Sequence, residues 1–254
     1  MTGEDWKSIV DKYALVDNDQ VLALNKPTGI SVMGERHDTD VARLAAEAGD
    51  KLHPVHRIDK ATSGLVLFAR DLKCHGVLTR QFNKRTVDKT YLAVVNSAEV
   101  PAAARIDLPL SVGRKNRVRV AAPREAITNT GTDWTVPETD VFTHVKTYPS
   151  VTEYDTLWTG DGLSLLAVRP ISGRRHQIRV HLAWTGFAIT GDSLYDKNPA
   201  TRMLLHSWRL AVEAPWLGGE RTTLEAAPGP DFWEPLPGVD AATVLPGVTP
   251  DQRR

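Results

Sequence analysis

A short polar stretch, His56 to Gly64, stands out because it runs directly into the apolar segment Ser63 to Ala69. Its sequence, HRIDKATSG, holds a single carboxylate, Asp59, between basic neighbours. An ionised carboxylate can act as a nucleophile or as a base. A lone Asp in a loop is also a common cap or turn residue, because its side chain mimics a backbone turn. The residue types alone leave both roles open for Asp59.

The polar stretch is one of several sequence blocks that follow each other along the chain. With its apolar continuation it reads HRIDKATSGLVLFA, which matches the signature HR[IL]D-x-x-TSG followed by aliphatic residues and Ala. The other blocks are LNKPTG (24–29), KTYLA (89–93), RPISGRRHQIRVHLAWTG (169–186), ITGDSLY (189–195) and LHSWRL (205–210). In this order, over about residues 20 to 212, the chain resembles RNA pseudouridine synthases of the RluA type.

The resemblance implies an isomerase that converts uridine to pseudouridine in RNA, with Asp59 as its essential carboxylate. The N1–C1′ bond must break, the uracil must turn over, and a C5–C1′ bond must form. Three roles stay open for Asp59: attack on C1′, attack on C6, or removal of the 2′ proton. Since the product keeps every atom and no redox change occurs, we expect neither a cofactor nor a metal.

The resemblance also supplies two partners for the carboxylate. Arg179 is the cation expected to keep Asp59 ionised in a dry site, because a planar, permanently charged guanidinium suits a buried carboxylate. The alternative for Arg179 is a phosphate-binding residue on a basic helix. Tyr91 is expected to stack on the uracil and to assist removal of the C5 proton. As a strand aromatic alone, Tyr91 would be a core residue.

Stacked RNA hides the target carbon, so the base must be flipped out at a cost of a few kcal/mol. Arg57 is the motif position expected to fill the vacated space or to contact the phosphate of the flipped nucleotide. Candidates for a phosphate-binding rim are Lys26, Arg174, Arg175, His176 and the segment 114–119. For each of them, an ordinary solvated charge is the alternative.

Other chemistries fit the sequence less well. The histidines invite a metal site, but His176 and His181 are five residues apart on an expected helix and do not share a face. A hydrolase built on Ser63 or Ser172 would lack the Gly-x-Ser-x-Gly elbow. The alternative from another class is an RNA-binding protein of the same fold without turnover, which substitution of Asp59 would separate from an enzyme.

The composition indicates a folded protein with one basic face that could bind RNA. The 254 residues carry no net charge, yet residues 56–119 hold thirteen Lys and Arg against five Asp and Glu. A basic face of this kind usually contacts phosphates. The family resemblance, without an S4 module, implies a stem-loop of ribosomal or transfer RNA as partner. No apolar run approaches the roughly 18 residues of a membrane span, and Cys74 is the only cysteine. We therefore expect a cytoplasmic monomer.

Hydrophobic patterning predicts an α+β fold, with a mixed, largely antiparallel sheet flanked by helices and loops. Expected strands are residues 21–25, 63–69, 91–95, 117–121, 163–168 and 203–212. A helix through Val41 and Ala45 is expected to start at Asp38 or Thr39 and to end at Gly49. A second should follow Asp71 with Leu72, Leu78 and Phe82 inward, and a third, amphipathic, should span 175–185.

We expect a catalytic domain over residues 1–215 and a Pro/Gly-rich tail over 216–254 that packs on or near it. Members of the family often carry an N-terminal S4 RNA-binding module, and we expect none here because little sequence precedes the first block. Residues 122–160 match no block and are expected to be a variable insertion that contributes to the choice of substrate.

Overall fold

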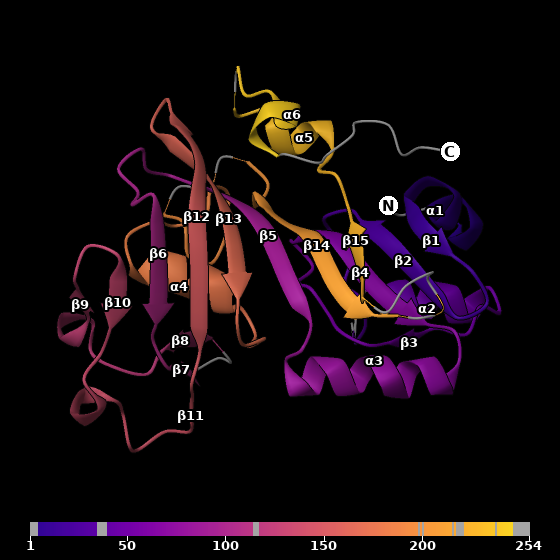
Figure 1. Ribbon diagram of the computed structural model, residues 1–254, viewed down its shortest axis with the longest axis horizontal. Helices are drawn as coiled ribbons and strands as arrows, with labels where there is room; N and C mark the ends of the chain where they lie inside the picture. Colours follow the sequence, from indigo (N-terminus) through magenta and orange to yellow (C-terminus); the bar gives the residue numbers. More distant parts are fainter. Residues whose placement is uncertain are drawn as a thin grey trace. The chain divides into compact units, whose positions relative to one another are not determined.

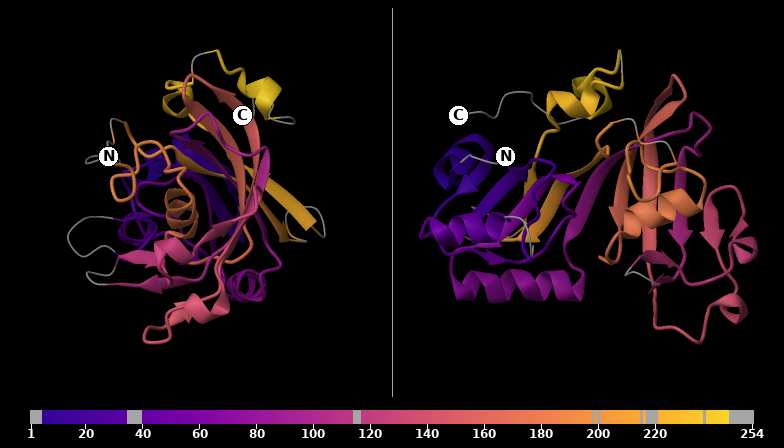
Figure 2. Two further views of the ribbon diagram at one scale, coloured as in Figure 1. Left: turned by 90° about the vertical axis from the view of Figure 1, so that its left-hand side faces the viewer. Right: turned by 180° about the vertical axis from the view of Figure 1, so that it is seen from behind.

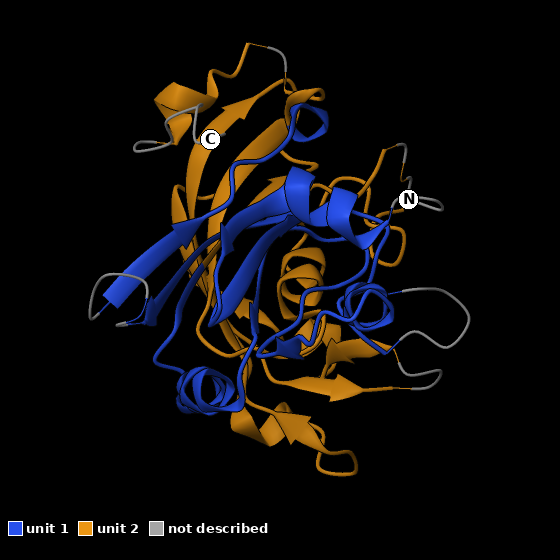
Figure 3. Cartoon of the chain, turned by 90° about the vertical axis from the view of Figure 1, so that its right-hand side faces the viewer, with its two compact units in different colours: residues 1–89, 205–232 blue, residues 90–204, 233–254 orange. Residues whose placement is uncertain are grey.

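The computed structural model describes residues 5–34, 40–113, 117–197, 199, 201–214, 216, 221–236 and 238–245. The chain forms two compact units, residues 1–89 with 205–232 (unit 1) and residues 90–204 with 233–254 (unit 2), coloured separately in Figure 3. Helices and strands occur in both units, and most strand pairs are antiparallel. The mixed α+β class expected from the sequence is confirmed (Figure 1).

Unit 1 is built around a strand that the sequence predicts. Its elements are α1 (Trp6–Tyr13), β1 (Ala14–Asp17), β2 (Val21–Lys26), α2 (Val41–Glu47), β3 (His53–Pro54), β4 (Ser63–Ala69), α3 (Leu72–Lys84), β14 (Leu205–Glu213), β15 (Arg221–Glu225) and α5 (Pro230–Trp233). Every residue of β4 is buried, because β2 and β3 pair with it antiparallel while β14 pairs with it in parallel. The parallel register joins Ser63 to His206.

The core of unit 1 lies between these strands and α3. This helix packs against β3, β4 and β14 and lies beside the sheet in Figure 1 and Figure 2. Asp71 caps α3 by accepting hydrogen bonds from the amides of Lys73 and Cys74. Leu78 is fully buried. The prediction that Leu72 faces inward is wrong, since its side chain is 69% exposed at the first position of the helix.

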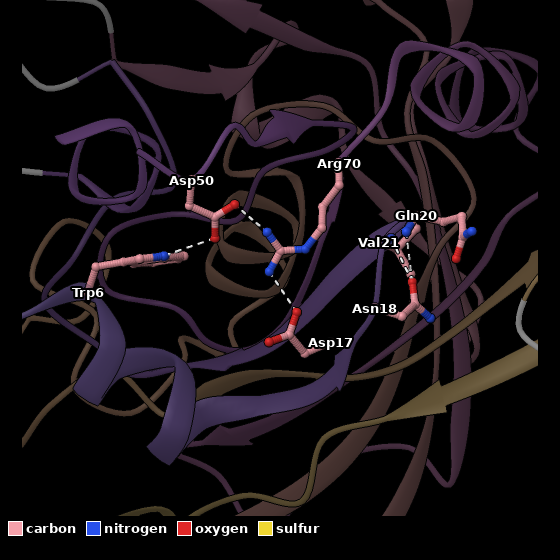
Figure 4. A network of polar contacts seen from close by, with 7 residues as sticks. All are labelled: Trp6, Asp17, Asn18, Gln20, Val21, Asp50 and Arg70. Carbon is pink, nitrogen blue, oxygen red and sulfur yellow. Dashed lines mark hydrogen bonds and ion pairs between the residues drawn. The ribbon is translucent and has the colours of Figure 1, made fainter. Parts of the chain in front are cut away.

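Polar contacts fix the N-terminal part of unit 1 (Figure 4). Arg70, which directly follows β4, donates hydrogen bonds to Asp17 and Asp50. Asp50 also accepts a 2.9 Å bond from the indole of Trp6. The expected starts of α2, Asp38 and Thr39, lie outside the described residues, and its cap is Asp40. These bonds tie α1, the β1–β2 hairpin and the end of α2 to the central strand.

Unit 2 contains a sheet whose strand pairs are antiparallel except for one parallel pair. Its elements are β5 (Asp88–Val95), β6 (Ala103–Asp107), β7 (Leu110–Val112), β8 (Val118–Val120), η2 (Arg124–Ala126), β9 (Thr128–Asn129), β10 (Asp133–Thr135), η3 (Glu138–Asp140), β11 (Thr147–Tyr148), β12 (Val151–Gly160), β13 (Leu163–Pro170), α4 (Gln177–Trp184) and α6 (Ala241–Val244). The strand order is β5-β13-β12-β6-β10-β9, in which β6 and β10 are parallel, and β11-β7-β8 form a small separate sheet.

The helix α4 packs on β12, β13 and β8, as the rear view in Figure 2 shows. The prediction of an amphipathic helix is wrong here: the six residues 177–182 are all buried. The segment 122–160 ends in β12, which pairs with both β6 and β13 and is central to unit 2. In the segment that we expect to be a tail, β15 adds a strand to β14.

Among the described residues, no helix combines the length and the apolar character needed to cross a membrane.

Candidate active site

The loop that carries Asp59 connects β3 to β4 in unit 1. Asp59 is half-buried, and its carbonyl accepts a hydrogen bond of 3.0 Å from the amide of Thr62, which closes a turn. The next carbonyl, of Lys60, accepts a 2.9 Å bond from the amide of Gly29. Ile58 anchors the loop in the core at 5% exposure. The backbone around Asp59 is thus fixed on both sides.

The side chain of Lys26, at the end of β2, contacts this loop. Its ammonium donates hydrogen bonds to the carbonyls of Pro27 (2.8 Å) and Ile30 (2.9 Å), with the carbonyl of Lys60 at 3.5 Å. The side chain is only 1% exposed, which does not fit the exposed phosphate-binding rim that the sequence suggests. Burial lowers the pKa of Lys26 to about 7, and the nearby Asp59 carboxylate opposes this shift.

His56 supports the loop from its other end. Its Nε2 accepts a 3.0 Å hydrogen bond from the amide of Leu67, and its ring stacks on Phe82 of α3 with centroids 4.7 Å apart. Because Nε2 accepts, the proton of the neutral ring sits on Nδ1. Burial, with a smaller contribution from the charge of Lys89, lowers the pKa of His56 to about 3. His56 is therefore a neutral structural residue near neutral pH.

The end of the signature is joined to β14. The hydroxyl of Ser63 lies 2.9 Å from Nδ1 of His206, whose Nε2 donates a 2.8 Å bond to the carbonyl of Ala226. Since Nε2 carries the proton, Nδ1 accepts from Ser63. At Gly64 φ is +103°, and an added Cβ would lie 2.2 Å from the carbonyl oxygen of Ser207. Only glycine allows β4 and β14 to approach so closely.

In unit 2, Arg179 forms a two-pronged ion pair. Its Nε and Nη2 each donate a 2.7 Å hydrogen bond, one to each carboxylate oxygen of Asp192. The side chains are 5% and 0% exposed. The guanidinium also lies over the ring of Tyr195, 5.4 Å from its centroid. This bidentate geometry fixes the plane of the guanidinium better than a single contact would.

Asp192 is itself held by the backbone. Its Oδ1 accepts a 3.0 Å bond from the amide of Leu194, and its own amide donates to the carbonyl of Ile189 at 3.1 Å. Gly191 precedes it with φ of +76°, where an added Cβ would lie 2.1 Å from the carbonyl oxygen of Arg202. Asp192 lies in the sequence block ITGDSLY (189–195), but the sequence alone assigns it no role. Its place in that block was the only sequence signal for it.

The start of α4 presents the basic residues of the fourth block. Arg174 is half-buried and Arg175 exposed. His176 adopts a left-handed conformation with φ of +53° and contacts the hydroxyl of Tyr195 through Nδ1 at 3.2 Å. That hydroxyl donates to the carbonyl of Val118 at 3.1 Å. The helix consequently begins at 177, two residues later than expected.

The sequence pattern of the RNA pseudouridylate synthase family matches residues 20–184 of this chain. The chain belongs to this family. It is 32% identical over 217 residues to the dual-specificity RNA pseudouridine synthase RluA of Escherichia coli K12, a match covering 82% of this chain and 90% of that protein. It is also 32% identical over 222 residues to tRNA pseudouridine synthase C of Pasteurella multocida, with 79% and 85% covered.

A solved structure agrees with this assignment. Human RNA pseudouridylate synthase domain containing 4 superimposes with a TM-score of 0.69 at 25% sequence identity, covering 89% of this chain and 92% of that chain. The RNA pseudouridine synthase activity and fold that the sequence predicts for this family member are therefore confirmed at the level of the family.

The remaining candidates are placed as follows. Tyr91 is half-buried in β5, opposite Val168 of β13 in the antiparallel register. Arg57 is exposed in the Asp59 loop. Asp59, Arg57 and Lys26 belong to unit 1, whereas Tyr91 and Arg179 belong to unit 2. Of the segment 114–119 suggested as a phosphate-binding rim, residues 114–116 lie outside the described chain.

The alternative chemistries find little support in the described parts of the chain. No three His, Cys, Asp or Glu side chains gather there in a way that could hold a metal ion. Ser63 bonds to His206, but the other nitrogen of that ring is bound to a backbone carbonyl rather than to a carboxylate. Ser172 donates to the amide oxygen of Gln177 at 2.7 Å. His181 is fully buried between Thr152 and the carbonyl of Leu108.

Proposed function

We propose that this family member isomerises specific uridines in stem-loops of ribosomal or transfer RNA, and that Asp59 is its catalytic carboxylate. Two of its relatives support this substrate class by their names, which specify a dual-specificity RNA enzyme and a tRNA enzyme. The observation that carries the proposal is the fixed loop around Asp59, with a buried ammonium beside a half-buried carboxylate.

The reaction consumes and produces no other molecule. The glycosidic bond between C1′ and N1 breaks, C1′ bonds to C5, the C5 proton leaves to solvent, and N1 takes up a proton. We assign to Asp59 the attack on the sugar or base, or removal of the 2′ proton. Tyr91 would stack on the uracil and assist removal of the C5 proton.

Arg179 would supply positive charge beside the reacting groups. Asp192 occupies its Nε and Nη2, so the direction of the remaining edge of the guanidinium is set by a rigid bidentate contact. Arg57 is exposed, as a residue that enters the space left by a flipped base must be. We keep Arg174, Arg175 and His176 as candidates for contacts to RNA phosphates, because they cluster at the start of one helix.

The test is release of tritium from RNA labelled at C5 of uridine, using transcribed ribosomal and transfer RNA without added metal or nucleotide. We expect release by the wild type and none by Asp59→Asn. Asp19→Asn is the matched control, because Asp19 is exposed in the same unit, and it should react like the wild type. RNA binding without release by the wild type would instead support the binding protein without turnover.

A further inference from the structure

Tyr148 of β11 holds two cations against its ring. The ammonium of Lys146 lies 5.4 Å from the ring centroid, and the guanidinium carbon of Arg174 lies 5.2 Å from it. Lys146 is exposed, whereas Tyr148 and Arg174 are half-buried. A cation near the face of an aromatic ring is attracted by the ring's quadrupole. This cluster, which we call the Tyr148 cluster, lies wholly within unit 2.

The backbone around the Tyr148 cluster is anchored. Tyr148 stands opposite Leu110 in the antiparallel register of β11 and β7. The carbonyl of Tyr148 accepts a 2.9 Å hydrogen bond from the hydroxyl of Ser150. The ring is therefore positioned by a strand and not by a loop tip, which limits the freedom of the cations that pack on it.

Arg174 is anchored through Gln177. The amide of Arg174 donates to Oε1 of Gln177 at 3.1 Å, while Nε2 of the same side chain donates to the carbonyl of Val151 at 2.8 Å and to Thr152. Gln177 is 3% exposed. It thus joins the loop that carries Arg174 to the start of β12, three residues after Tyr148.

The positive charges of the cluster are not neutralised by acidic side chains in the described part of the protein. Neither Lys146 nor Arg174 has a carboxylate partner among the described residues, and the buried Nε of Arg174 has no hydrogen-bond acceptor there. The acids of the adjacent strand are already occupied, since Glu153 pairs with Arg105 and Asp155 with Arg169. Two held cations without counter-charges favour an anionic ligand.

We propose that Lys146, Tyr148 and Arg174 form a contact site for RNA phosphodiesters outside the flipped nucleotide, which strengthens RNA binding without taking part in the chemistry. The inference rests on the proposed function in that RNA is the substrate. Lys146 and Tyr148 come from the segment 122–160, which matches none of the sequence blocks of the family.

The test measures the affinity for end-labelled total bacterial tRNA at several salt concentrations. Lys146→Ala should flatten the slope of log K against log[salt] by about 0.7 to 0.9, the change expected for one lost phosphate contact. Lys146→Arg should keep the slope. Tyr148→Leu should weaken binding although it removes no charge, because the ring positions both cations, whereas Tyr148→Phe should bind like the wild type. Lys73→Ala, an exposed lysine of unit 1, is the control.

In the tritium assay, Lys146→Ala and Tyr148→Leu should show a raised KM and an unchanged kcat, whereas Lys146→Arg, Tyr148→Phe and Lys73→Ala should match the wild type. An unchanged salt slope and KM for Lys146→Ala would overturn the proposal, and because Lys146 is exposed, this variant tests it even if Tyr148→Leu fails to fold. A wild type that binds tRNA through Lys146 but releases no tritium would refute the proposed function and leave the phosphodiester site standing.

Discussion

Arg179 and Asp192 form a buried, bidentate ion pair in which each of two guanidinium nitrogens lies 2.7 Å from one carboxylate oxygen. Arg179 comes from α4, whereas Asp192 comes from a turn whose glycine, Gly191, tolerates no Cβ. The guanidinium at the end of a long flexible side chain is oriented here by a partner that is itself fixed. If Arg179 has the catalytic role that we propose, Asp192 acts through it as a positioning residue.

Asp192→Asn should lower kcat by about 100-fold, because small misplacements of a catalytic group have effects of that size. It should also destabilise the fold by about 3 to 5 kcal/mol, since it removes the charge of one partner from a buried, bidentate ion pair. Tritium release and urea unfolding measure the two effects. Asp155→Asn, whose ion pair with Arg169 is largely exposed, should change stability by less than about 1 kcal/mol. Full activity in Asp192→Asn would contradict the positioning role.

Gly64→Ala should destabilise the protein by more than about 3 kcal/mol, combining backbone strain with a steric clash. The new Cβ would meet the backbone of Ser207 at 2.2 Å, at a φ of +103°. Gly76→Ala in α3 is the control: nothing lies within 4 Å of its Cβ position. Because alanine favours a helix over glycine, the control should gain about 0.5 to 1 kcal/mol. Urea denaturation of both variants checks this contrast, and equal stabilities would refute the close strand approach.

Several elements were predictable because their signals are local. The strand 63–69 is a continuous apolar run, and Asp71 is a strong helix cap, so both were placed correctly from sequence. β12 was missed although the buried Thr152 and Tyr154 alternate with half-buried neighbours in its first half, because polar residues interrupt the apolar pattern. The alternation was the available signal.

The site was predictable only in part. The motif blocks lead to the proposal of Asp59, Tyr91 and Arg179 as site residues, but no local pattern shows that Arg179 pairs with Asp192, since the contact depends on how the turn after α4 folds back. The inward placement of the Lys26 ammonium was likewise hidden, because a lysine in a basic sequence resembles a surface charge until its carbonyl partners are known.

Acid should destabilise the protein through His56. Its pKa is about 3 in the folded protein against 6.5 for the ordinary group, so the unfolded chain binds more protons between these pH values. Stability therefore falls as the pH decreases from 6.5 towards 3, by up to about 1.4 kcal/mol per pH unit for this group. His56→Gln should flatten this dependence in urea unfolding. His144→Gln, at an exposed position, should leave it unchanged. Identical profiles for wild type and His56→Gln would contradict the neutral, buried imidazole.

Lys26 should make the stability of the protein depend on pH in the alkaline range. Burial lowers its pKa from 10.5 to about 7, so between these values the unfolded chain carries a proton that the folded protein lacks. The wild type should thus gain stability as pH rises through this window, by up to about 1.4 kcal/mol per unit. Lys26→Met lacks the titrating group, so the stability of the wild type relative to this variant should increase from pH 7 to pH 10.5.

Lys26→Met should also reduce kcat, because it removes the charge beside Asp59 and the hydrogen bonds that Lys26 donates to the carbonyls of Pro27 and Ile30. Each buried carbonyl left without a donor costs about 1 to 3 kcal/mol. Lys7→Met, at an exposed position of α1, is the control for loss of a lysine. If Lys26→Met kept the wild-type kcat while Asp59→Asn abolished tritium release, Asp59 would work without its buried neighbour, and Lys26 would only stabilise the loop.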